Sequence, residues 1–174
     1  GPATSAALYY PTSVAVDSGG NLFIADSSNL RVRKVSSDGI ITTVAGNGNV
    51  PQWPRVSGGA AATDTPIVPF QVAVDGTGNL FIAEGPYADV RKVSPDGTIS
   101  SALPSGTVLP FMGFITAITV DRAGNLFIAG SVCDDDTNCT LPIRKISPAG
   151  SITVIAISNP ISLEPGSDVG DGGL

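Results

Sequence analysis

The chain has 174 residues, no histidine and a formal net charge of −6 at pH 7. The lack of histidine excludes catalytic triads that depend on His and zinc sites ligated by His. The acidic balance excludes the basic surface that nucleic-acid binding requires. Because no run of about 18 apolar residues occurs, we also predict no membrane span.

One stretch of the chain, residues 13–46, recurs twice in altered form. The second copy starts at Gln71 and the third at Ala117. The third copy carries an insertion, residues 131–141, in its middle. A repeat of this length usually marks one structural unit of a solenoid or propeller, so it decides the fold.

Each copy contains four short apolar runs, which in the first copy are residues 13–16, 21–25, 30–35 and 40–45. Val, Ile, Leu and Phe dominate these runs, and each has the length of a strand. No segment shows helical spacing of apolar residues over ten or more positions. Each copy is therefore predicted to be a four-stranded antiparallel meander, and the protein to be all-β. The second run is apolar without alternation, which predicts sheets covered on both faces.

Two tight turns recur in every copy. The first has the pattern Asp-x-x-Gly-Asn, in which Gly accepts positive φ and the Asp side chain bonds local amides. The second is Ser-x-Asp-Gly or a close variant, at residues 36–39, 94–97 and 147–150. Groups repeated identically in each copy are interpreted as structural. The residues assigned to the first turn are Asp17, Gly20, Asn21, Asp75, Gly78, Asn79, Asp121, Gly124 and Asn125.

The first copy reads Pro-x-x-Val-Ala-Val-Asp-x-x-Gly-Asn-Leu-Phe-Ile-Ala-Asp-x-x-Asn-x-Arg-Val-Arg-Lys-Val from Pro11. This pattern resembles the NHL repeat, and in particular bacterial secreted NHL-repeat proteins. The resemblance implies a β-propeller, usually of six blades. The second copy has Glu84 and the third Gly130 where the first has Asp26, which argues against a site role for Asp26 but not against the fold.

We predict one unit over residues 1–174, with blades at 12–46, 70–102 and 115–156 and linkers at 47–69, 103–114 and 157–174. Propellers close with about four to eight blades. Three blades therefore predict half of a six-bladed ring, completed by a second chain or by further repeats of a longer chain. The two ends of the sequence resemble two halves of one interblade linker, although Gly1-Pro2 is also what tag removal leaves.

Long, variable loops are expected at one end of the blades. In an antiparallel meander the two tight turns lie at one end, and the remaining connections lie at the other. Variable loops on a rigid scaffold commonly carry binding residues, so this end is the predicted binding face. The alternative is that the aromatic residues cap the blade cores. The candidate residues are Trp53, Arg55, Tyr87, Phe111, Met112, Asp134, Asp135 and Asp136.

The insertion in the third copy contains the only two cysteines, Cys133 and Cys139. A disulfide between them would imply an oxidising compartment, and two free thiols are the alternative. With few charges and many Gly, Pro and Thr residues, this pair favours a secreted or cell-surface protein. Residues 134–138 resemble the start of a calcium loop, but Cys139 stands where Gly is expected, so we interpret them as a solvated acidic loop and predict no metal.

Six of the nine basic residues form Arg-Lys pairs at matching repeat positions, starting at Arg33, Arg91 and Arg144. We expect these pairs to be surface charges that keep strand edges soluble.

No set of residues suggests catalysis, so the sequence favours a non-enzymatic scaffold or a module that binds a protein or small molecule, with no cofactor. We expect it to self-associate as a homodimer of six blades. Two alternatives stay open. One is a metal-dependent enzyme of the lactonase or lyase sort, with its site at the ring centre. The other is a fragment of a larger extracellular receptor or adhesin.

Overall fold

The computed structural model describes residues 1–52, 58–85, 89–103, 115–133 and 139–157. Blade 1 is an antiparallel sheet with strand order β1-β2-β3-β4. Its strands are β1 (Pro11–Val16), β2 (Leu22–Asp26), β3 (Arg31–Val35) and β4 (Ile41–Ala45). Short 3₁₀ turns, η1 (Ala3–Ser5) and η2 (Ser27–Asn29), precede β1 and follow β2.

Blade 2 has five strands, in the order β5-β9-β8-β7-β6. They are β5 (Gly58–Ala61), β6 (Pro69–Val74), β7 (Leu80–Glu84), β8 (Asp89–Val93) and β9 (Thr98–Ser101), and the 3₁₀ turn η3 (Ala62–Asp64) follows β5. The fifth strand, β5, comes from a segment that the sequence suggested was a linker. Its Gly-Gly-Ala-Ala sequence has little strand propensity, so its pairing with the outer edge of β9 depends on backbone hydrogen bonds.

Blade 3 has the order β10-β11-β14-β15. Its strands are β10 (Ile115–Val120), β11 (Leu126–Gly130), β14 (Ile143–Ile146) and β15 (Ile152–Ala156). The insertion forms a separate two-stranded ribbon, β12 (Val132–Cys133) and β13 (Cys139–Thr140). In its register Cys133 lies opposite Cys139.

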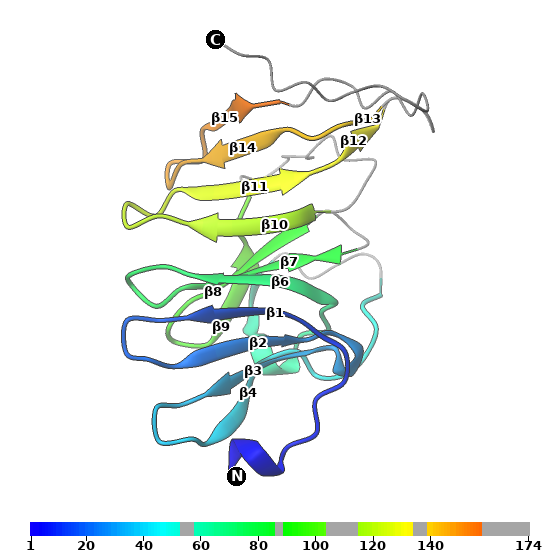
Figure 1. Ribbon diagram of the computed structural model, residues 1–174, viewed down its shortest axis with the longest axis vertical. Coiled ribbons are helices and arrows are strands. Elements are labelled where there is room, and N and C mark those ends of the chain that lie inside the picture. The colour runs from blue at the N-terminus through cyan, green and yellow to red at the C-terminus, as the bar shows by residue number, and fades with distance from the viewer. Residues whose placement is uncertain (53–57, 86–88, 104–114, 134–138, 158–174) are drawn as a thin grey trace, which may run out of the picture.

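The three blades stack face to face in chain order, with the tight turns gathered along one side of the stack, on the left in Figure 1. The inner strands β1, β6 and β10 lie next to one another in that order. Together they line a shallow hollow with a volume of about 280 Å³. The prediction of an all-β chain made of antiparallel blades is confirmed.

The core consists of two apolar layers, one between each pair of neighbouring blades. The first contains Phe23, Ala25 and Val32 of blade 1 against Val72, Leu80 and Ile82 of blade 2. The second contains Phe81, Ala83 and Val90 of blade 2 against Leu126, Ile128 and Ile146 of blade 3. All five residues of β7 are buried, as expected for a strand in a sheet covered on both faces.

The expectation that the Arg-Lys pairs are surface charges is wrong for two arginines. Arg91 and Arg144 are only 4% and 8% exposed. Each lies opposite an isoleucine, Ile82 or Ile128, on the sheet face that packs against the preceding blade. The lysine of each pair lies on the opposite face of the sheet, where its long side chain can extend toward solvent. In blade 1, Lys34 Nζ lies 5.7 Å from the centroid of the Phe23 ring.

Candidate functional site

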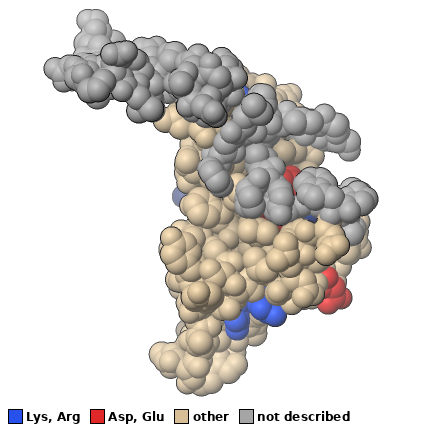
Figure 2. All heavy atoms as spheres, turned by 90° about the vertical axis from the view of Figure 1, so that its right-hand side faces the viewer, with Lys and Arg blue, Asp and Glu red and all other residues tan. Residues whose placement is uncertain are grey.

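The sequence predicts a binding face on the side of the stack opposite the tight turns, and Figure 2 turns this side toward the viewer. All eight of its candidate side chains lie outside the described residues, so the binding face stays a prediction. These residues are Trp53, Arg55, Tyr87, Phe111, Met112, Asp134, Asp135 and Asp136. The described residues visible on this side show only small patches of charge.

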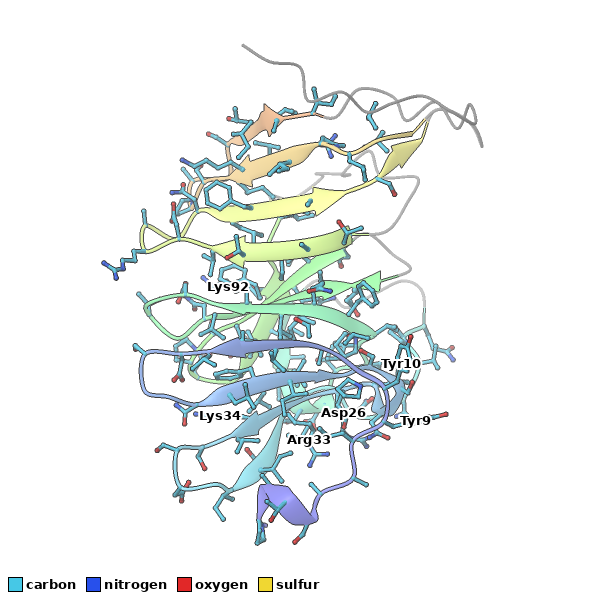
Figure 3. All side chains as sticks on the ribbon, in the orientation of Figure 1. Tyr9, Tyr10, Asp26, Arg33, Lys34 and Lys92 are labelled. Carbon is cyan, nitrogen blue, oxygen red and sulfur yellow. The ribbon has the colours of Figure 1, made fainter. Side chains whose placement is uncertain are left out.

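Two buried carboxylates lie where the second strand of a blade reaches this side. Asp26 is fully buried, and its Oδ1 accepts hydrogen bonds from the Tyr9 amide at 2.8 Å and from Asn29 Nδ2 at 3.0 Å. Arg33 Nη1 lies 3.8 Å from Asp26 Oδ2, and Tyr9 and Tyr10 extend from the same end of the blade (Figure 3). Asp26 thus joins the segment entering β1 to the connection between β2 and β3.

Glu84 occupies the same position in blade 2 and is also fully buried. Its Oε1 accepts a hydrogen bond from the Val68 amide at 2.8 Å, just before β6. Both carboxylates therefore hold the chain as it enters an inner strand. In blade 3 the equivalent residue is Gly130, which has no side chain for this contact.

The repeated aspartates lie in the tight turns between the first two strands of each blade. Asp75 Oδ1 accepts hydrogen bonds from the amides of Thr77 and Asn79, both at 2.9 Å, and its Oδ2 accepts one from Asn79 Nδ2 at 2.7 Å. Asp17 and Asp121 make the equivalent contacts with Asn21 and Asn125. These carboxylates stabilise the turns they belong to.

The hydrogen bonds also lower the pKa of the three aspartates. For Asp121 the main cause is the side chain of Asn125, followed by its backbone amide. For Asp17 and Asp75 burial raises the pKa, but the hydrogen bonds from Asn21 and Asn79 more than offset it. The aspartates are therefore ionised acceptors with local donors. In the part of the chain that the structure describes, no group of three Cys, Asp or Glu side chains is arranged to hold a metal ion.

A groove of about 530 Å³ opens between blades 2 and 3 on the side with the tight turns. Phe81, Leu126 and Ile146 line its apolar part, and Lys92 and Arg122 supply its positive charge. The sequence did not indicate this groove, because the turns around it repeat in every copy. It arises from how two blades pack, and no local signal marks it.

Between blades 1 and 2 the corresponding space is filled by the chain itself. The 3₁₀ turn η3 lies there, and its Ala62 is 1% exposed. The Ala62 amide donates to the Gly97 carbonyl, and the Ala62 carbonyl accepts from the Gly46 amide, both at 2.9 Å. The first residues of the chain approach the outer edge of blade 1 in the same way, since the Ala3 amide donates to the Gly39 carbonyl at 2.8 Å.

The two outermost faces of the stack expose residues that are buried elsewhere. Val14 of β1 is 63% exposed, whereas Val72, at the same position of blade 2, is 4% exposed. Ile143 of blade 3 is 38% exposed, whereas its equivalents Val32 and Val90 are fully buried. These two open faces are the largest structural feature that the described fold leaves unexplained.

Comparison with known proteins agrees with this architecture. The family model of the NHL repeat matches residues 8–35. A gluconolactonase from Xanthomonas campestris is 15% identical with a TM-score of 0.59, covering 86% of this chain and 48% of its own. A putative gluconolactonase is 10% identical with a TM-score of 0.55, covering 84% and 48%. The virginiamycin B lyase of Staphylococcus aureus is 14% identical with a TM-score of 0.48, covering 83% and 54%.

A search of curated proteins finds no match. Among the described residues, no helix is long and apolar enough to cross a membrane. The chain spans about half the length of the solved structures to which it is similar. The protein is thus an all-β partial propeller of three blades that carries an NHL repeat at residues 8–35 and corresponds to half of a six-bladed propeller.

Proposed function

We propose that this chain is a non-enzymatic propeller scaffold, or a module that binds a protein or small ligand, and that it self-associates to close a ring. The observation that supports the proposal is the pair of open blade faces. Their residues have the same types as the residues buried between blades, yet Val14 and Val16 are each 63% exposed. Exposed apolar sheet faces of this kind mark association surfaces.

The hydrophobic effect supplies the driving force. Covering a valine-sized side chain contributes roughly 1.5–3 kcal/mol. Val14 and Val16 contribute on blade 1, and Phe127 and Ile143 contribute on blade 3. A ring with two such contacts also leaves no apolar blade face in water.

A second candidate is a metal-dependent lactonase- or lyase-like enzyme whose site forms at the centre of the closed ring. It is favoured by the gluconolactonase neighbour at a TM-score of 0.59, although an identity of 15% supports only the fold. Isothermal titration of the assembled protein with Ca²⁺, Mg²⁺, Mn²⁺ and Zn²⁺ distinguishes the candidates. Stoichiometric, tight binding of one ion favours the enzyme, and no heat of binding favours the scaffold.

A third candidate, a segment of a larger extracellular receptor or adhesin, shares the proposed secreted or cell-surface location. In that case further blades of the same polypeptide would cover the open faces. A full-length gene that encodes additional repeats would favour it.

The first test of the proposal is the mass in solution, measured by light scattering after size exclusion over a range of protein concentrations. We expect a single species at twice the chain mass of 17.5 kDa. A well-folded monomer at all concentrations up to about 100 µM, far above the dissociation constants of specific interfaces, would contradict self-association.

A further inference from the structure

We propose that the ring closes head to tail. The exposed face of blade 3 packs against the exposed face of blade 1 from a second copy, and a two-fold axis through the centre of the ring relates the copies. This inference rests on the proposed self-association, and it identifies the two surfaces that meet and their register.

Every blade has two chemically different faces. The forward face, which meets the following blade, carries a Phe, an Ala and a branched residue. In blade 1 these are Phe23, Ala25 and Val32, and in blade 2 they are Phe81, Ala83 and Val90, all at most 7% exposed. In blade 3 the register places Phe127, Ala129 and Ile143 at the same positions. There they are only partly buried or exposed.

The rear face, which meets the preceding blade, carries aliphatic residues. In blade 2 these are Val72, Leu80 and Ile82, all at most 4% exposed. In blade 1 the same register positions hold Val14, Leu22 and Ile24. Val14 is 63% exposed and Leu22 is half-buried, whereas Ile24 lies deeper at 6%.

The two interfaces between neighbouring blades inside the chain, here called seams, each join a forward face to a rear face. A forward face is open on blade 3, and a rear face is open on blade 1. Two copies related by a two-fold axis therefore form two identical seams, each of the kind already present between blades 1 and 2 and between blades 2 and 3. This arrangement closes at six blades and does not extend into a filament. A contact between two rear faces has no counterpart in the chain.

A polar contact joins the inner strands at the interface between blades 1 and 2, and blade 3 carries the residue that could repeat it. Thr12 Oγ1 of β1 donates to the Phe70 carbonyl at 2.6 Å, across the seam between blades 1 and 2. Ser13 Oγ accepts from the Val72 amide at 3.1 Å in the same seam. Thr116 occupies the Thr12 position in blade 3, and its hydroxyl donates to the Ala129 carbonyl at 3.2 Å. In the closed ring the Thr116 hydroxyl lies where it can donate to the carbonyl of Thr12 of the partner subunit.

The experiment uses one charged substitution on each open face and a matched control. Val14→Asp changes the rear face of blade 1, and Ile143→Asp changes the forward face of blade 3. The control is Val50→Asp, because Val50 is also 63% exposed but lies in the loop after β4, outside the strands that form both faces. Light scattering after size exclusion gives the mass of each variant, and circular dichroism checks that each is folded.

We expect both face variants to be monomers and the control to be a dimer. An equimolar mixture of the two face variants recovers a dimer, because one of its two seams then joins two unchanged faces. Where an aspartate variant fails to fold, Val14→Thr and Ile143→Thr replace it. We expect these to raise the dissociation constant of the dimer at least tenfold.

The outcomes separate this inference from the proposed function. A monomeric unmodified chain contradicts self-association itself. A dimer that is lost in Val14→Asp but retained in Ile143→Asp shows contact between two rear faces, which overturns the head-to-tail arrangement and leaves self-association intact. Two monomeric variants that stay monomeric when mixed also overturn it.

Discussion

Val14 and Val72 occupy the same position in consecutive repeats, where each lies opposite an isoleucine of the neighbouring strand. Val14 is nevertheless 63% exposed, whereas Val72 is 4% exposed. The difference arises because blade 1 packs against the rear face of blade 2, while nothing in the described chain packs against the rear face of blade 1.

Truncating these two valines is expected to have unequal effects on stability. Val72→Ala removes two buried methyl groups and lowers the free energy of unfolding by about 2 kcal/mol. Val14→Ala changes it by less than about 0.5 kcal/mol in the monomer, because the side chain is already in water. Urea unfolding at low protein concentration measures both values. Equal losses at low concentration would show that Val14 is covered within one chain.

Gly46 is expected to tolerate no side chain. It has a φ of +86°, and an added Cβ would lie 2.3 Å from the Leu30 carbonyl oxygen and 2.9 Å from Arg31 Cα. Because both neighbours are backbone atoms, Gly46→Ala should cost more than about 3 kcal/mol and displace the chain after β4. Thermal and urea unfolding measure the loss.

Gly39→Ala is the matched control for this prediction. Gly39 also has a positive φ, +80°, but an added Cβ meets nothing within 4 Å. Only the conformational cost applies, about 1–2 kcal/mol. If the two variants lose the same stability, the close approach at Gly46 is not what limits this position.

Acid is expected to weaken the tight turns. The pKa of Asp75 in the folded chain lies below its ordinary value of 3.8. Its contribution to stability is therefore fully present above that value and is lost as the pH falls through the lower, folded pKa. Asp75→Asn should cost about 1 kcal/mol at pH 7 and reduce the loss of stability below pH 4. Urea unfolding from pH 7 to pH 2 tests both.

Asp64→Asn makes the same chemical change at an exposed position. The Asp64 side chain has no hydrogen bond to any described residue; only its carbonyl accepts one, from Asn47. This variant should keep the stability of the unmodified chain at pH 7. Identical pH profiles for the two variants would exclude the turn hydrogen bonds as the source of acid sensitivity.

The cysteine pair is expected to resist alkylation. The backbone register places Cys133 directly opposite Cys139 in the ribbon of β12 and β13, as a cross-strand disulfide requires. Intact-mass analysis after iodoacetamide treatment in denaturant should show no added groups without a reductant and two groups with it. Two groups without a reductant would establish free thiols and remove the argument for an oxidising compartment.

The parts of the fold that the sequence predicted are those that depend on local contacts. The Asp75 carboxylate accepts hydrogen bonds from Thr77 and Asn79, two and four residues away, so a motif of five residues is enough to predict the turn. The apolar run of β7 predicts a sheet covered on both faces, and all five of its residues are buried, whereas the same run in blades 1 and 3 lies in sheets with one open face. The repeat then places the same meander three times.

The features that the sequence did not indicate depend on distant contacts. The pairing of Gly58–Ala61 with β9 joins residues about forty positions apart, and neither segment encodes it through its own propensity. The burial of Arg91 and the groove beside Lys92 follow from how neighbouring blades approach each other. The pattern of apolar residues along a strand does not specify how closely two blades approach each other.

By itself, then, the sequence determined the strands, the turns and the threefold repeat, because backbone preference and hydrogen bonds within a few residues specify them. Only the tertiary structure decided which face of each sheet is covered. Val14 and Val72 stand in nearly identical local sequences, so no local rule separates them. Their burial differs because blade 1 covers Val72, whereas no described blade covers Val14.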